Sequence, residues 1–141
     1  MTELTALVGR PDVLRGGGSL VPLGQGYVLA PVGEEAWDEI GAALADDPAL
    51  AGDLTRFLAL LVRGAGVRVE TGGRFAYLEI DEGKQSAIVG AGGAVVDAYA
   101  TELDGSEALV PRSDWAVNRA LRDIGVTATD GTDEGATLGL T

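Results

Sequence analysis

The sequence predicts an α+β fold, in which an antiparallel meander sheet of four to five strands packs against two N-terminal helices and one C-terminal helix. Three observations predict it. Apolar residues recur every three to four positions between residues 34 and 62, the period of amphipathic helices. The period falls to two between residues 67 and 101, where glycine-rich turns separate runs typical of half-buried strands. A helical period returns between residues 117 and 124.

The 141 residues fit one domain, which we place at residues 26–126. Before it, chain breakers are dense enough that we expect residues 1–25 to form an arm or loop. These breakers are Pro11, Gly16, Gly17, Gly18, Pro22 and Gly24. After it, residues 127–141 are rich in Gly, Thr and Asp, so we expect a flexible tail or a weak terminal strand. A short strand at residues 27–30 should stop at Pro31.

Two amphipathic helices should follow this strand. The first begins at Glu34 and places Trp37, Ile40 and Leu44 on one stripe. Asp47 and Pro48 should close it and open the second helix, as the N-cap and the first helical residue. The second helix, which ends at residues 64–66, carries the main apolar stripe of the core. That stripe consists of Leu50, Leu54, Phe57, Leu58, Leu61 and Val62.

The sheet should begin with a hairpin of residues 67–71 and 75–80 around Gly72 and Gly73, which suit a tight turn. Strands at residues 85–89 and 95–101 should complete the meander. The last helix should start at residues 111–114 and end before Gly125.

The chain has no histidine and no cysteine, which removes the most common general base, the thiolate nucleophile and the usual zinc ligands. Its one lysine, Lys84, falls in a predicted turn, where a solvated ammonium group is expected. In the dinucleotide-binding pattern G-x-G-x-x-G, Val95 stands where the third glycine is required. The glycine-rich stretch at residues 90–93 therefore fits a turn between strands. We therefore expect no catalytic, cofactor-binding or metal-binding residues and no enzymatic activity.

A small carboxylate-based enzyme remains the alternative. It would require acidic side chains to converge in one deep pocket. The residues that would have to meet are Glu34, Asp38, Glu79 and Asp97.

The 22 acidic and 10 basic residues give a net charge of -12, which repels nucleic acid and anionic membranes. Such a charge favours encounter with a basic protein, or simply keeps a small domain soluble. The first residues lack the positive region of a signal peptide, and no apolar run is long enough to span a bilayer. A cytoplasmic location is the default expectation.

The order of elements resembles that of the YbjN-like (TY-Chap) domains of bacteria, which in turn resemble type III secretion chaperones. The resemblance covers residues 34–126. It is carried by Trp37, Leu44, Leu54 and Leu58, then by residues 66–69, 74–80 and 121–126. It implies helices layered on an antiparallel sheet that holds a peptide or helix of another protein, frequently as a dimer. The resemblance brings no catalytic residues with it.

Together these observations predict a non-catalytic protein-binding module, chaperone-like or adaptor-like, that offers its sheet or an edge strand to an amphipathic segment of a partner. An immunity-type inhibitor of a basic toxin is the alternative of another class. Homodimer formation is left open. The candidate partner-binding residues are aromatic or cationic: Trp115, Phe75, Tyr77, Tyr99, Arg119 and Arg122.

Overall fold

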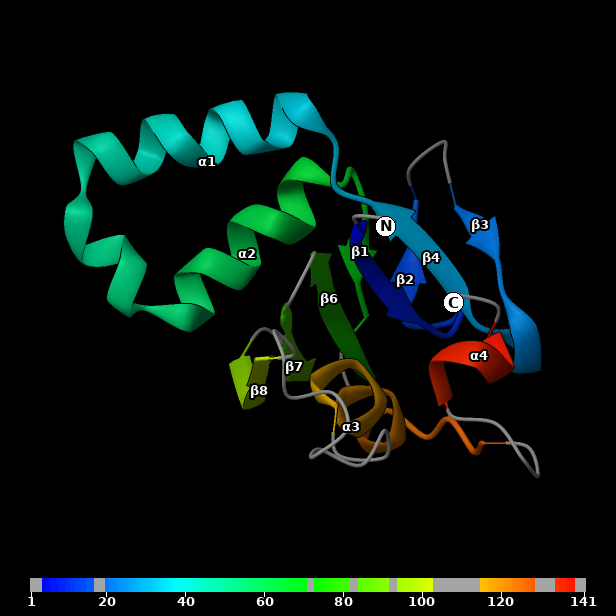
Figure 1. Ribbon diagram of the computed structural model, residues 1–141. Coiled ribbons are helices and arrows are strands. Elements are labelled where there is room, and N and C mark those ends of the chain that lie inside the picture. Colours follow the sequence, from blue (N-terminus) through cyan, green and yellow to red (C-terminus); the bar gives the residue numbers. More distant parts are fainter. Residues whose placement is uncertain are drawn as a thin grey trace.

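The computed structural model describes residues 4–16, 20–70, 73–81, 84–91, 94–102, 115–128 and 134–138 (Figure 1). The fold is α+β, with a six-stranded antiparallel sheet in the order β3-β4-β1-β6-β7-β8. Its strands are β1 (Leu4–Gly9), β3 (Val21–Pro22), β4 (Val28–Pro31), β6 (Arg74–Asp81), β7 (Lys84–Ala91) and β8 (Ala94–Glu102). Two short strands, β2 (Leu14–Arg15) and β5 (Arg68–Val69), form a second sheet.

Helices cover both faces of the six-stranded sheet. They are α1 (Glu34–Asp46), α2 (Leu54–Gly64), α3 (Ala116–Asp123) and α4 (Glu134–Leu138), with 3-10 turns η1 (Gly24–Gly26) and η2 (Pro48–Gly52). On β6, Ala76 and Leu78 pack toward α3, whereas Phe75 and Tyr77 pack toward α1 and α2. Because both faces are covered, residues 75–78 are all buried instead of alternating with exposed ones.

The predicted meander is confirmed for β6, β7 and β8, which pair in sequence order. Opposite β7, β8 contains an irregularity: Val89 pairs with Asp97 and Gly90 with Val95, so Val96 is an extra residue. Such a bulge bends and twists the strand that carries it.

The expected N-terminal arm is wrong for residues 4–9, which form β1 in the middle of the sheet, between β4 and β6. Ala6 and Val8 join the core on the α3 side, and Leu7 joins the core under α1 and α2. The breakers in this region begin only after β1, so their density says nothing about residues 4–9. The sheet is therefore larger than predicted.

The hairpin predicted between residues 67–71 and 75–80 is also wrong. β5 pairs with β2, through Leu14 and Val69, and the edge of β6 that it would have used is occupied by β1. β1 pairs five residues with β6, and three of them, Ala6, Leu7 and Val8, are fully buried between the two helical layers, which a solvent-facing hairpin strand could not match. Residues 71 and 72 of the predicted turn lie outside the described part of the chain.

The second predicted helix is divided in two. Asp47 caps η2, where its Oδ1 accepts the backbone N–H of Ala49 at 3.2 Å, as expected for an N-cap. Asp53 then caps α2, where its Oδ1 accepts the backbone N–H of Arg56 at 3.2 Å. A second capping residue, six residues downstream of Asp47, therefore starts a new helix at Leu54.

The C-terminal helix α3 is confirmed, and Gly125 follows it at φ +102°, a conformation that favours glycine. The starting residues 111–114 lie outside the described ranges. The prediction of a flexible tail or weak strand is wrong for α4, where Leu138 is buried in the core beside α3. Glu134 lies 3.4 Å from Arg122, which helps to fix α4 on α3. None of the helices in the described ranges is long and apolar enough to cross a membrane.

Candidate interaction surface

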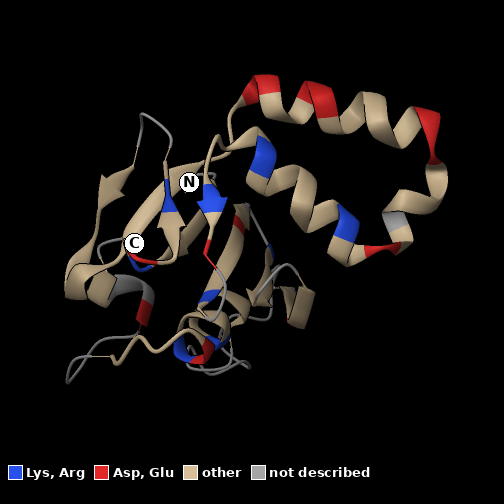
Figure 2. Cartoon of the chain, turned by 180° about the vertical axis from the view of Figure 1, so that it is seen from behind, with Lys and Arg blue, Asp and Glu red and all other residues tan. Residues whose placement is uncertain are grey.

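Helices α1 and α2 form a hairpin whose base, near Trp37, packs on the sheet. At that end the Trp37 ring lies 6.4 Å from the ring of Phe57 and 6.3 Å from the ring of Tyr77. The Trp37 Nε1–H donates to Thr5 Oγ1 on β1 at 3.4 Å. The other end, with η2, extends sideways past the sheet in both views (Figures 1 and 2). We call this projecting end, residues 44–56, the overhang.

The apolar stripe of α2 runs across the sheet and then past its edge. Leu54, Leu58 and Leu61 lie at helical positions i, i+4 and i+7 and face the same way. Their exposed fractions are 40 %, 3 % and 0 %. Leu58 packs on β7, where a side chain at Gly90 would come within 2.7 Å of its Cδ2. At Leu54, its first residue, α2 lies at the last strand of the sheet, so no further strand covers this side chain.

Strand β8 is that last strand, and in the described part of the chain it pairs only with β7. At its start, the backbone N–H of Val95 donates to Thr55 Oγ1 of α2 at 3.4 Å, which places the overhang directly beside it. Val96 in the bulge is 47 % exposed. Ala98 and Ala100 are exposed as well, and they sit opposite Ile88 and Ser86 on the sheet face that carries the hairpin.

The outer edge of β8 carries backbone groups that β7 does not use. The backbone N–H of Val32 donates to Thr5 O, so odd residues of β1 bond toward β4. Alternation across the antiparallel ladders then points the N–H and C=O groups of Ala98 and Ala100 outward. The N–H of Ala98 is met by the side chain of Asp97, whose Oδ1 accepts it at 3.0 Å. An acidic side chain thus covers one edge amide.

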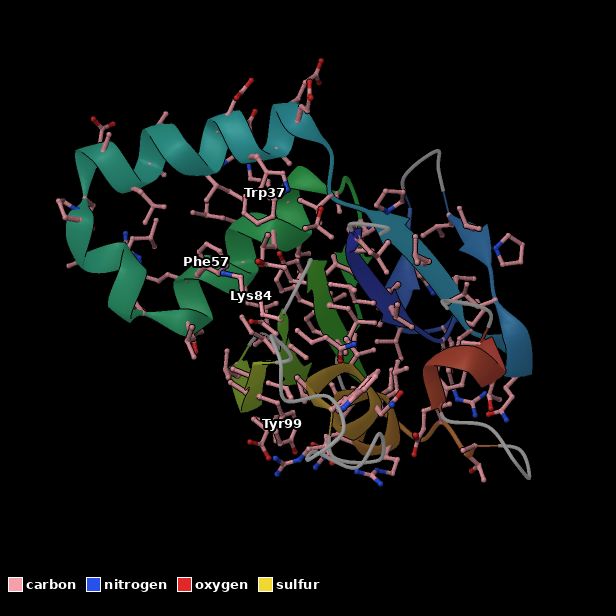
Figure 3. All side chains as sticks on the ribbon, viewed as in Figure 1. Trp37, Phe57, Lys84 and Tyr99 are labelled. Carbon is pink, nitrogen blue, oxygen red and sulfur yellow. The ribbon has the colours of Figure 1, made fainter. Side chains whose placement is uncertain are left out.

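On the opposite face, β8 and α3 bring together a polar cluster. The Tyr99 hydroxyl lies 2.9 Å from Asp97 Oδ2 and also contacts Asp123 Oδ2. The Arg119 guanidinium lies 4.3 Å from the centre of the Tyr99 ring, a cation–π arrangement. The hydrogen bond to Asp123, more than burial, raises the pKa of Tyr99 above its usual range. Figure 3 shows Tyr99 beside α3, and Trp37, Phe57 and Lys84 on the hairpin side.

A small apolar pocket opens on the flank of α2. It has a volume of about 250 Å³ and is lined by Thr55, Leu58, Ala59, Val62, Val69 and Phe75. Thr55 both lines this pocket and contacts the start of β8, while the other lining residues come from α2, β5 and β6.

The candidate partner-binding residues divide between the core and the surface. Phe75 and Tyr77 are buried under the hairpin, so these two cannot contact a partner directly. A strand buried on both faces has no exposed set of residues, which the sequence pattern alone did not reveal. The other candidates lie on β8 and α3. Tyr99 and Arg119 contact each other, Arg122 pairs with Glu134, and half-buried Trp115 is the N-cap residue of α3.

The carboxylates of the enzyme alternative lie on different elements. Glu34 and Asp38 are exposed on α1. Glu79 accepts a hydrogen bond from the Tyr77 hydroxyl at 3.0 Å on the hairpin face, while Asp97 lies on the α3 face. Within the described ranges no three acidic side chains are grouped closely enough to hold a metal ion.

Sequence reasoning missed Leu54 and Val96 as surface residues. Leu54 belongs to the apolar stripe of a helix, and only the topology shows that the sheet ends before it.

Comparisons of the chain with protein-family models, with curated proteins and with solved structures gave no match. Its function therefore has to be inferred from its own geometry, in which the most distinctive feature is the overhang beside β8, a strand that has β7 as its one partner among the described residues.

Proposed function

We propose that this domain is a non-catalytic protein-binding module, chaperone-like or adaptor-like, which holds an extended segment of a partner as an added strand beside β8. The observation that carries the proposal is the stripe of α2, buried at Leu58 and Leu61 and exposed at Leu54. A seventh strand beside β8 would lie under this exposed end. A chaperone-like role of the YbjN-like kind belongs to the same proposal.

Strand addition would use two sources of affinity. The outward N–H and C=O groups of Ala98 and Ala100 would pair with the backbone of the added strand. Burial of Leu54 would add to this affinity. Burying a fully exposed leucine side chain is worth about 1.5–3 kcal/mol, and Leu54 is 40 % exposed, so covering it would contribute part of that amount. The bulge and Asp97 make unspecific pairing at the same edge less favourable, which is a common feature of natural edge strands.

The proposal is tested by co-purification from the native host with matched variants. Leu54→Glu places a charge under the overhang, yet Glu is favoured in the first turn of a helix, so the fold should survive. Val21→Glu changes an equally exposed residue at the opposite edge of the sheet, on β3. We expect a stoichiometric companion with the wild type and with Val21→Glu, and its loss with Leu54→Glu. A domain that purifies alone, or a companion insensitive to Leu54, would contradict the proposal.

A second candidate, the immunity-type inhibitor of a basic toxin, is favoured by the outer face of α1. Glu34, Glu35, Asp38 and Glu39 are all exposed there, and Figure 2 shows the acidic positions along this helix. An acidic face would speed encounter with a basic protein. This candidate requires an association rate that falls steeply with salt and that depends on α1 charges rather than on Leu54. Neighbouring genes without a toxic or secreted product would count against it.

A further inference from the structure

We infer that the segment held at β8 is an amphipathic strand with large apolar side chains on the face under the overhang and an arginine or lysine on the face of Asp97. This inference rests on the proposed function and names the chemistry of the partner. Side chains of an added strand alternate between the two faces of the sheet, so each face of the segment meets a different surface.

On the hairpin face, the added strand would meet apolar groups with room beside them. Ala98 and Ala100 are the β8 residues on this face, and their small side chains leave space above the sheet. The overhang provides the opposite wall, with exposed Leu54. Large apolar residues on the partner would fill this space.

On the α3 face, the added strand would meet acidic groups. Asp97 is exposed and Asp123 is partly buried, while the Arg119 guanidinium already lies over the Tyr99 ring. A carbonyl group of the added strand would accept the Ala98 N–H in place of Asp97 Oδ1. Asp97 Oδ1 would then be freed beside the new strand, while Oδ2 keeps its hydrogen bond from the Tyr99 hydroxyl, and a cation of the partner could pair with the carboxylate through Oδ1.

The same charges disfavour a second copy of this chain as the occupant. Residues 94–102 contain no lysine or arginine, so two β8 strands side by side would set Asp97 of each copy against a strand without cations. The net charge of -12 on each copy adds to the repulsion.

Exposed Lys84 lies on the hairpin face, where it disfavours a partner cation and leaves the Asp97 face as the place for one.

Fluorescein-labelled decapeptides test this inference through binding to the purified domain, measured by anisotropy. One peptide alternates valine and arginine, a second alternates valine and glutamate, and a third alternates serine and arginine. We expect the first to bind at least about tenfold more tightly than either of the others, which corresponds to 1.4 kcal/mol. Asp97→Lys should abolish this preference for arginine over glutamate, and Leu54→Glu should weaken binding of the valine peptides.

Glu35→Lys is the control for unspecific attraction, because it changes the net charge as much as Asp97→Lys but lies on the outer face of α1. It should leave the preference for arginine nearly unchanged. Equal binding of both valine peptides, lost in Leu54→Glu, would overturn the inference and leave the proposed function standing. Peptide binding that ignores Leu54, or no binding of any peptide, would overturn both.

Discussion

Gly64 of α2 lies so close to Ala36 of α1 that a side chain at residue 64 would place its Cβ 2.5 Å from the Cβ of Ala36. This contact closes the base of the helical hairpin, next to Trp37. Gly64→Ala should therefore force the two helices apart. We expect a loss of about 1–3 kcal/mol in the free energy of unfolding, measured by urea denaturation.

Gly41→Ala is the matched control for this substitution. Gly41 lies within α1, and a Cβ there would meet nothing within 4 Å. Alanine in an exposed helix interior is preferred over glycine by roughly 0.5–1 kcal/mol, so this variant should be more stable than the wild type. Equal effects of the two substitutions would contradict the packing described for Gly64.

Asp97→Ala should make the domain self-associate more readily. The variant loses both the acceptor that covers the Ala98 N–H and a negative charge at the sheet edge. Self-pairing of the wild type has to break this hydrogen bond, which is worth about 1 kcal/mol net. Without that cost, the dissociation constant for self-pairing should fall at least roughly fivefold. Analytical ultracentrifugation over a concentration series measures this. Asp97→Asn keeps the acceptor without the charge, and an identical response of the two variants would show that the covering hydrogen bond has no effect.

Leu138→Ala tests whether the C-terminal segment belongs to the core. Leu138 is buried against α3, and truncation of a buried leucine costs about 2–5 kcal/mol. Leu54→Ala is the control of the same chemistry at an exposed position, and it should cost less than about 1 kcal/mol. Urea denaturation of both variants decides the point: a Leu138→Ala protein as stable as Leu54→Ala would mean that α4 contributes nothing to the fold.

Local patterns in the sequence predicted α1, most of α2, α3 and the pairing of β6, β7 and β8, because each depends on neighbouring residues. Asp47 caps a helical turn and Gly125 ends α3 as their residue types require. Strand pairing depends instead on distant segments. Residues 4–9 occupy the edge of β6 where the predicted hairpin placed residues 67–71, and a local sequence pattern cannot show which of two distant segments pairs there.

The candidate site was predictable only in part for the same reason. Tyr99 and Arg119 were identified by residue type and do lie together at the surface. Phe75 and Tyr77 share that type, but the second helical layer buries them. The exposure of Leu54 follows from where the sheet ends, which is a property of the topology rather than of α2.

Tyr77 should make the stability of the domain fall at alkaline pH. Burial, followed by the neighbouring charge of Glu79 and the hydrogen bond to it, raises the pKa of Tyr77 far above its ordinary value near 10. Above pH 10 the unfolded chain therefore loses the Tyr77 proton while the folded chain keeps it. The unfolded state then binds fewer protons, so the free energy of unfolding decreases as the pH rises.

Tyr77→Phe removes this contribution and also the 3.0 Å hydrogen bond to Glu79. At pH 8 the variant should be less stable by about 1 kcal/mol, because one net hydrogen bond is lost. Between pH 9 and 11 its stability should fall less steeply than that of the wild type, so the two curves approach each other. A slope remains, since the pKa of Tyr99 is raised as well, first by its hydrogen bond to Asp123. Urea denaturation at each pH measures both curves, and parallel curves would show that Tyr77 ionises equally readily in the folded and unfolded chains.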